Sequence, residues 1–451
     1  MTGGRAGGVE SASPAGTVRF GGDLAEDTSL LAGYVSEGER LLAELPAKAA
    51  RDALQRRLAA DILSASRAVR SAFLTLHAGT VYETLTAART RPLRLPELVY
   101  AAADRFPGLV PTAAQMADEF RKPQAEREGR EIDQGVFCGA VLRCPVAGSH
   151  LIDVMSAPVP RSLELIGDFQ RTGRAGLGSV EVERRGHAAH VTFRNAHCLN
   201  AEDSRLIDDL ETAVDLVLLD DRVRVGVLRG GFVEHPRYRG RRVFSAGINL
   251  KELGNGGIRL VEFLLGRELG YINKIYRGLL TGSAAEVHPR YSVHKPWVGA
   301  VDSFAIGGGM QLLLVLDRVI AEEDAYFSLP AAEEGIIPGL GNLRLSRLIG
   351  ARPARRVILS GHRIRMTDPE AGLVCDEVVP AKEMEDAIER AVEELAGPAV
   401  SANRRMLALC EEPLDLFREY LAEFAVGQAV RAYSDDVLAK LERWRRPRPE
   451  R

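Results

Sequence analysis

Two glycine-containing turns hold the residues of this sequence that are best suited to catalysis. One is residues 303–311, S-F-A-I-G-G-G-M-Q, which joins an apolar run typical of a buried strand to an apolar run typical of a helix. Three consecutive glycines at this junction leave the first N–H groups of the helix open to a ligand. These N–H groups lie at the positive end of the helix dipole, so they stabilise an oxygen atom that gains negative charge.

A glycine triplet alone also fits a tight turn, so the prediction depends on a second turn upstream. Residues 243–252, V-F-S-A-G-I-N-L-K-E, pass from a short apolar strand end through small residues to a polar helix start. The N–H groups of Ile248 here and of Gly308 in the triplet (Gly309 is the neighbouring alternative) would form an oxyanion hole for a thioester enolate. Losing one such donor typically costs about 2.7–4 kcal/mol of transition-state stabilisation.

Four motifs resemble, in order, those of the crotonase (enoyl-CoA hydratase/isomerase) superfamily. The two turns resemble its two oxyanion motifs. Residues 326–341, Y-F-S-L-P-A-A-E-E-G-I-I-P-G-L-G, and residues 372–380, G-L-V-C-D-E-V-V-P, resemble its third and fourth signatures. The resemblance implies an α/β fold with a ββα spiral core, a coenzyme A thioester as substrate, and C-terminal helices that build homotrimers or homohexamers.

Two positions depart from the pattern of the family's hydratases. Those enzymes place one carboxylate three residues after the oxyanion glycine and another directly after the proline of the third motif. The first position holds Gln311 here, and the second holds Ala331. Hydration needs one group to activate water and another to deliver a proton, so these residues argue against hydratase activity. The nearby Glu333 and Glu334 start the following segment in the family's pattern, and we interpret them as structural.

An enolate held without water-handling groups can transfer an electron to molecular oxygen if it is electron-rich enough. The helical N-terminal segment and the second and third motifs resemble a branch of the superfamily that oxygenates aryl-acetyl-CoA with neither metal nor organic cofactor. The resemblance implies a dioxygenase of glycopeptide-antibiotic biosynthesis that turns a resorcinol-type aryl-acetyl-CoA and O2 into an aryl glyoxylate and coenzyme A. The substrate then supplies the electrons that other oxygenases take from iron or flavin. Gln311 would line the pocket and contact the substrate or a peroxide.

Two other functions stay open from the sequence. A crotonase-type acyl-CoA hydrolase or decarboxylase is also compatible with Gln311 and Ala331. A non-enzymatic relative would bind coenzyme A esters or scaffold a partner through its N-terminal helices.

Two charged residues are candidates for contact with the ring hydroxyls. Arg267 lies in an otherwise apolar helical pattern, V-E-F-L-L-G-R-E-L-G, and we assign it to a ring hydroxyl. The alternative is a surface salt bridge with Glu262 or Glu268, worth about 0–1 kcal/mol. Glu202 lies at a predicted helix start, where an acid ordinarily caps the helix, and contact with a phenol is its alternative role.

Basic residues in a predicted loop are candidates for contact with coenzyme A. His235 lies in E-H-P-R, where a histidine is ordinarily just exposed, and Lys251 matches a basic position that in crotonases lies near the adenine end. Arg239, Arg241 and Arg242 form a basic cluster that we interpret as solvated, with contact to coenzyme A phosphates as the alternative.

Metal and dinucleotide sites are not supported by the sequence. His187 and His190 are three residues apart at the entry to a predicted strand, which places them on opposite faces. No acid completes a 2-His-1-carboxylate triad, and no G-x-G-x-x-G follows a strand.

The elements that must position these residues fall into four segments with distinct patterns. They are a Gly, Ser and Ala-rich lead expected to be disordered (1–25), a helical N-terminal domain (26–175), a core of strands and helices that holds all four motifs (176–380) and a C-terminal helical segment (381–451). In the core the predicted order is strand, strand, helix, strand and then the two turns. A helix is predicted at residues 384–395, and a long helical region at 414–441.

Composition limits the partners and the compartment. The 451 residues are 46% hydrophobic and 27% charged, which fits two or three domains with sizeable cores. A net charge of −3 gives no electrostatic reason to expect nucleic acid or a membrane surface as a partner. The five cysteines are scattered and form no C-x-x-C pair, which is typical of reduced thiols in a cytoplasmic protein.

Overall fold

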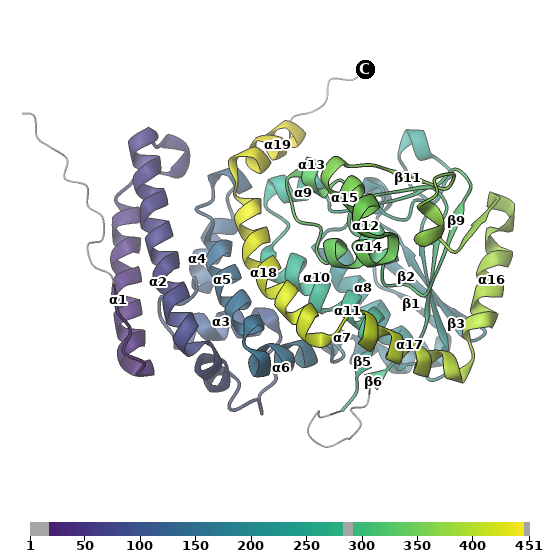
Figure 1. Cartoon of the computed structure of the whole chain (residues 1–451), viewed down its shortest axis with the longest axis horizontal. Helices are drawn as coiled ribbons and strands as arrows, with labels where there is room; N and C mark the ends of the chain where they lie inside the picture. Colours follow the sequence, from purple (N-terminus) through teal and green to yellow (C-terminus); the bar gives the residue numbers. More distant parts are fainter. Residues whose placement is uncertain (1–17, 283–291, 446–451) are drawn as a thin grey trace, which may run out of the picture.

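The computed structural model describes residues 18–282 and 292–445 (Figure 1). Helices of the N-terminal part stand at one end of the molecule, and a mixed core with two sheets lies at the other. Helix α18 (Leu414–Ala432) runs between the two parts. This arrangement confirms the predicted α/β fold with a helical N-terminal region and C-terminal helices.

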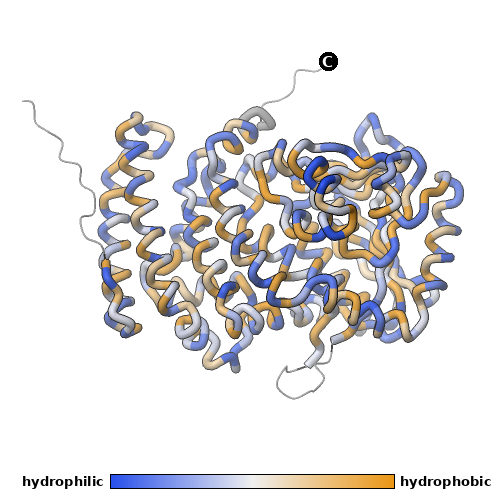
Figure 2. The backbone as a smooth tube through the Cα atoms, viewed as in Figure 1, coloured by the Kyte–Doolittle hydropathy of each residue, from blue (hydrophilic) through white to orange (hydrophobic). Residues whose placement is uncertain are grey.

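The N-terminal part is helical, as the apolar spacing predicted. Its helices are α1 (Leu24–Ala43), α2 (Ala53–Leu85), α3 (Leu95–Arg105), α4 (Ala113–Phe120), α5 (Arg130–Arg143), α6 (Pro145–Met155) and α7 (Pro160–Thr172). Figure 2 shows hydrophobic and hydrophilic positions interleaved along these helices, as expected for helices with one buried side. Within the described ranges no single helix is long and apolar enough to cross a bilayer; α5 and residues Pro145–Thr172 pass that test only as a pair bent by 106°.

The start of α1 differs from the predicted disordered lead. Residues 1–17 of that lead fall outside the described residues, but α1 begins at Leu24 and its N-cap is Asp23. The N–H groups of Gly21 and Gly22 each donate to the Asp27 carboxylate at 2.9 Å, and Asp27 pairs with His77 of α2 at 2.7 Å. Local composition could not reveal this order, because the acid and the histidine that create it lie further along the chain.

Seven strands form the main sheet, in the order β1-β2-β3-β4-β7-β9-β12. They are β1 (Arg174–Gly176), β2 (Val180–Arg185), β3 (Ala188–Phe193), β4 (Val225–Gly230), β7 (Trp297–Val301), β9 (Arg318–Glu322) and β12 (Glu377–Val379). The first three pair antiparallel, and the pairs from β3 to β12 are parallel. Helix α8 (Ser204–Leu219) lies between β3 and β4 in the chain, which confirms the predicted strand, strand, helix, strand order.

The main sheet is covered on both faces. Val227, Val298 and Ile320 pack with α16 (Met384–Leu395) in one apolar cluster, whereas Leu228 and Val301 belong to the larger core that includes α8. Neighbouring residues of one strand therefore point to opposite sides.

A second sheet of three short strands, in the order β11-β10-β8, carries the third motif. These strands are β8 (Phe304–Ile306), β10 (Tyr326–Ser328) and β11 (Ile364–Arg365). Helix α12 (Gly308–Leu313) follows β8 after a single residue, Gly307. The apolar run after the glycine triplet, residues 312–316, is helical only to Leu313, where α12 ends. Strands β5 (Leu279–Leu280) and β6 (Ser292–Val293) form a separate pair.

The C-terminal helices pack against both other parts. They are α16, α17 (Pro398–Glu411), α18 and α19 (Asp435–Arg445), and they follow the core helices α14 (Gly341–Ile349) and α15 (Ala351–Ser360). The long region predicted at 414–441 is thus two helices. Helix α18 lies directly on α5: a Cβ atom at Gly135 would come within 2.6 Å of the Ala425 carbonyl oxygen. One apolar core contains residues from all three parts, so the boundaries near 176 and 380 mark changes of pattern and not breaks in packing.

Candidate active site

The two glycine-containing turns lie against each other. Ser245 and Ala305 form a parallel β-bridge, and the Ile306 N–H donates to the Ser245 carbonyl at 2.9 Å. Gly247 has φ of +84°, and a Cβ atom there would lie 3.4 Å from the nitrogen of Gly308. The fold therefore brings the Ile248 turn and the Gly308 turn into direct contact, although 60 residues separate them in the sequence.

Both turns have free backbone donors. Within the described part of the chain, the N–H groups of Ile248, Gly308 and Gly309 donate to no protein acceptor, whereas the flanking Gly307 and Asn249 N–H groups are bonded. Unpaired N–H groups at a helix start are suited to an oxyanion. The arrangement can therefore hold the oxygen of a thioester enolate, as the sequence predicts for Ile248 and Gly308.

The glycines of the second turn are required by close packing. A Cβ atom at Gly308 would lie 2.4 Å from a carboxylate oxygen of Glu202. One at Gly309 would lie 2.7 Å from the Cβ of Ser245. Any side chain at either position would displace the groups that shape the turn.

Arg267 is the central side chain of the site. It lies in α10 (Gly266–Leu269), directly after a π-helical turn (Leu260–Leu265), and is 3% exposed. Its Nε donates to Glu202 at 2.7 Å and its Nη1 to Glu268 at 2.7 Å. Nη1 also donates to Gln311 Oε1 at 2.9 Å, and Nη2 donates to the Gly308 carbonyl at 2.7 Å. Burial opposes its charge, but the Glu202 carboxylate raises the pKa of Arg267 above its usual range.

These contacts correct one sequence-based interpretation of Arg267. The salt bridge with Glu268 is present, but it is buried and not on the surface. The pairing with Glu262 is wrong, because Glu262 lies 3.8 Å from Arg259 instead. Because each nitrogen of Arg267 already has a protein acceptor, its contact with a ring hydroxyl stays a prediction.

Glu202 is not the helix cap that the sequence suggested. Asp203 caps α8 by accepting the Leu206 N–H at 2.9 Å, so the cap lies one residue later. Glu202 is 2% exposed, forms a parallel β-bridge with Ile248 and pairs with Arg267. It lies at the oxyanion turns, which the sequence could not show because Arg267 is distant in the chain.

Gln311 has a fixed orientation. Arg267 has only donors, so it must face the Oε1 atom of Gln311 and leave Nε2 pointing away. In the described part of the chain no protein group accepts from Nε2. Gln311 therefore offers a neutral donor where the family's hydratases hold a carboxylate.

Ala331 and the acids after it supply no carboxylate to this position. Ala331 is buried at the start of α13 (Ala331–Glu334). Glu333 is exposed, and a Cβ atom at Gly361 would lie 2.2 Å from its carboxylate, so it points to the end of α15. Glu334 is half-buried, and burial raises its pKa.

The predicted coenzyme A contacts lie on exposed segments. His235 is exposed; its Nδ1 accepts the Arg237 N–H at 3.2 Å. Lys251 is exposed on α9 (Leu250–Asn255). Arg241 pairs with Asp324 at 2.8 Å, so it is not free.

No gathering of His, Cys, Asp or Glu side chains suited to a metal ion occurs within residues 18–282 and 292–445. His190 is half-buried, and burial lowers its pKa to about 4. All five cysteines are free.

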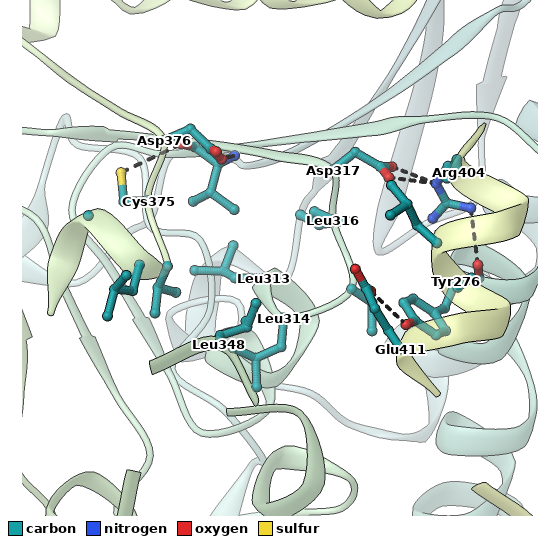
Figure 3. Close-up of a pocket in the computed structure, with 17 residues that line it drawn as sticks. Tyr276, Leu313, Leu314, Leu316, Asp317, Leu348, Cys375, Asp376, Arg404 and Glu411 are labelled. Carbon is teal, nitrogen blue, oxygen red and sulfur yellow. Dashed lines mark hydrogen bonds and ion pairs between the residues drawn. The ribbon is translucent and has the colours of Figure 1, made fainter. Parts of the chain in front are cut away.

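A separate cavity of about 280 Å³ lies at the other end of α12 from the oxyanion turns (Figure 3). Leu313, the last residue of α12, and Leu314 line it. Figure 3 shows its polar groups paired with each other: Arg404 donates to Asp317 at 2.7 Å, and the Tyr276 hydroxyl to Glu411 at 3.1 Å. None of the candidate site residues lines this cavity.

Sequence reasoning named Glu268 only as a surface partner of Arg267, and it missed Gly339. Glu268 is the buried partner of Arg267, and Gly339 lies over Glu268 and Gln311, the two acceptors of Arg267 Nη1. With φ of +43°, Gly339 has no room for a Cβ atom, which would lie 2.1 Å from Glu268 Oε1 and 2.7 Å from Gln311 Oε1. The P-G-L-G of the third motif was the available signal.

A family profile and several known proteins match this chain. The profile described as enoyl-CoA hydratase/isomerase matches residues 183–416, more than half of the chain. The chain belongs to the enoyl-CoA hydratase/isomerase family. A family member from Rhizobium meliloti (strain 1021), described as a probable enoyl-CoA hydratase, is 30% identical over 46% of this chain and 71% of its own length. The crystal structure of enoyl-CoA hydratase from Bacillus halodurans is 22% identical, covers 59% of this chain and 100% of its own, and has a TM-score of 0.49.

One relative within the enoyl-CoA hydratase/isomerase family matches far more of the chain. The (3,5-dihydroxyphenyl)acetyl-CoA 1,2-dioxygenase of Amycolatopsis orientalis is 55% identical over 415 residues, which are 92% of this chain and 95% of the relative. An alignment of that length extends beyond the family profile into the N-terminal helices.

Proposed function

We propose that this chain is a cofactor-independent dioxygenase that converts 3,5-dihydroxyphenylacetyl-CoA and O2 to 3,5-dihydroxyphenylglyoxylate and coenzyme A. The observation that carries the proposal is the pair of free oxyanion donors close to a neutral Gln311, in a chain that holds Ala331 where the family's hydratases have their second carboxylate. The identity of 55% to a relative of this activity supports the same substrate. We propose that the aryl glyoxylate formed is used in antibiotic biosynthesis.

The first step is formation of an enolate at the two turns. The N–H groups of Ile248 and Gly308 bind the thioester oxygen and stabilise its negative charge as Cα loses a proton. Gln311 directs an N–H donor, not an acid, at the site, so the enolate cannot recover the proton from a carboxyl group at position 311.

The later steps balance without another reductant. Electrons of the enolate form a C–O bond with dioxygen, and the terminal oxygen of the resulting peroxide attacks the thioester carbonyl. The C–S bond breaks and coenzyme A leaves as a thiolate. Loss of the second Cα proton with cleavage of the O–O bond leaves a ketone beside a carboxylate. Both atoms of dioxygen end in the product, and one released proton ends on the thiol.

The coenzyme A portion would lie over the exposed face around α9. Lys251 is exposed on α9, and His235 is exposed in the loop before the first oxyanion turn, so both are available for contact with its phosphates or adenine. We propose that both residues contact the substrate. The cytoplasmic location stays a prediction from the cysteines.

The test compares oxygen uptake with thiol release. Purified protein treated with a metal chelator should consume one O2 for each thiol released from 3,5-dihydroxyphenylacetyl-CoA. Under argon, thiol release should stop. If thiol release continues unchanged under argon, the chain is an acyl-CoA hydrolase. If activity disappears with the chelator and returns with a metal ion, the cofactor-independent mechanism is wrong.

A further inference from the structure

Five buried charged residues form a single row, called the file below, that begins at the oxyanion turns. Glu202 pairs with Arg267 at 2.7 Å, and Arg267 pairs with Glu268 at 2.7 Å. Glu268 faces Arg344 of α14 at 3.8 Å, and Arg344 pairs with Glu412 at 3.0 Å. The signs alternate along the file, and none of these five residues is more than 5% exposed.

The far end of the file is firmly held. Glu412 follows α17 and is fully buried. It accepts from Arg344 Nε at 3.0 Å and Nη2 at 3.1 Å, and from Nη2 of Arg277, the last residue of α11 (Tyr271–Arg277), at 2.9 Å. Burial opposes its charge, but Arg344 and Arg277 hold the pKa of Glu412 below its usual range. Because two guanidinium groups fix one carboxylate, Arg344 has little freedom to move.

Glu268 joins the two halves of the file. Its Oε1 accepts from Arg267, whereas its Oε2 is buried and accepts no hydrogen bond within the described residues. Gly339 closes over it, as its missing Cβ atom shows. Burial raises the pKa of Glu268, and Arg267 and Arg344 oppose this by favouring the carboxylate. A substrate carbon has no access to the buried Oε2, so direct proton transfer is not the role of this group in the arrangement observed.

The near end of the file sets the direction of two donors. Arg267 holds the Gly308 carbonyl oxygen at 2.7 Å. In a planar trans peptide the next N–H, that of Gly309, which is the alternative to Gly308 as oxyanion donor, points the opposite way. Arg267 likewise holds Oε1 of Gln311, which turns Nε2 away from the file. A shift of the guanidinium would therefore redirect both donors.

We propose that Glu268 and Arg344 are positioning residues that hold Arg267 against the Gly308 carbonyl and Gln311, and so aim the hydrogen-bond donors of the site. The inference deepens the proposed function and rests on it for the identity of the thioester. It assigns catalytic importance to two residues that touch neither the backbone donors nor Gln311.

The test uses Glu268→Gln, Arg344→Met and the double variant. Glu128→Gln is the matched control, because Glu128 pairs with the buried Arg51 at 2.7 Å among the N-terminal helices. Two rates are measured: oxygen uptake with 3,5-dihydroxyphenylacetyl-CoA, and exchange of its Cα hydrogens in D2O under argon, which reads the enolate step alone. Thermal melting and binding of a non-reactive thioester analogue show that each variant is folded.

The expected result is a loss of rate without a matching loss of binding. Oxygen-uptake kcat and Cα exchange should both fall about 100-fold in each single variant, because misplaced donors no longer fit the transition state. KM should change less than about threefold, since substrate binding is retained. The double variant should be no slower than the slower single variant, because the two residues act as a unit. Arg344→Lys should recover part of the rate, and Glu128→Gln should keep all of it.

Wild-type kcat and exchange in the folded variants would overturn the proposal and leave the file a purely structural feature. Additive losses in the double variant would overturn it too. If Glu268→Gln does not fold, Arg344→Lys decides, because it keeps the charge and loses only the two-point contact with Glu412: a fall in exchange at unchanged analogue binding supports the positioning role, and unchanged exchange rejects it. Absence of oxygen uptake by the wild-type protein, with exchange intact, would reject the dioxygenase function but not the role of the file.

Discussion

Gln311 and Arg267 meet through a hydrogen bond whose direction is fixed, because a guanidinium group has donors and no acceptor. That contact makes the residue three positions after Gly308 a donor, whereas the family's hydratases place an acid there. The difference between adding water and reacting with oxygen can thus depend on one side chain that cannot give back a proton.

At the residue scale we expect Gln311→Glu to lower oxygen uptake by about 100-fold, because the new carboxyl group can return a proton to the enolate. Exchange of the Cα hydrogens in D2O under argon should rise relative to oxygen uptake. Gln311→Leu is the control, since it removes the donor without adding an acid and should lower oxygen uptake without this relative rise in exchange. Wild-type oxygen uptake by Gln311→Glu would show that the neutral amide is not needed.

The residue scale also shows what the sequence could and could not predict. The two turns and the missing acids were visible, because motif order and residue type are local properties. The role of Glu202 was not, because it is defined by Arg267, which is 65 residues away in the sequence and reaches Glu202 only in the folded chain. The neighbouring Glu268 could be named as a partner of Arg267, but its burial could not be predicted. Glu202 looked like a helix cap, and only the Asp203 cap one residue later shows that it is free for another partner.

At the scale of elements, the contact of α5 with α18 depends on small residues. Gly135→Ala should reduce the free energy of unfolding by about 1–3 kcal/mol, because its Cβ atom would lie 2.6 Å from a carbonyl oxygen of α18 and something must shift. Denaturant unfolding followed by circular dichroism measures the change. Gly167→Ala is the control: this helical glycine has nothing within 4 Å of a new Cβ atom, so stability should be equal or higher by about 0.4–1 kcal/mol. Equal stability of the two variants would contradict the close-packing argument.

The elements themselves were mostly predictable. Helical spacing gave the bounds of α16, and strand alternation and helical spacing gave the order of β2, β3 and α8. Packing partners were harder to predict. Apolar spacing shows that α18 buries a face, but not that the face is opposite α5, nearly 280 residues earlier in the chain.

At the scale of the whole molecule, three exposed leucines predict an assembly. Leu348 of α14, Leu373 and Leu407 of α17 are 43%, 52% and 58% exposed and line the cavity of Figure 3. We propose that copies of this chain cover them in a homotrimer or homohexamer, because an exposed apolar patch of this kind is a common interface.

Sedimentation equilibrium tests the assembly. The wild-type mass should be three or six times 49.1 kDa, and the double variant Leu373→Glu, Leu407→Glu should shift toward 49.1 kDa. Leu54→Glu is the control, because Leu54 is 66% exposed on α2 and lies outside the cavity. A wild-type monomer, or an unchanged mass in the double variant, would reject this interface.

The place of α18 between the N-terminal helices and the core has a consequence for synthesis. The ribosome synthesises α5 long before α18. The face of α5 that α18 covers, which includes Gly135 and Gly139, therefore stays uncovered while most of the protein is being made. This face of α5 must stay free of wrong contacts until α18 has been synthesised. A premature stop codon before α18 would therefore destabilise the N-terminal helices around α5 as well as remove the C-terminal ones.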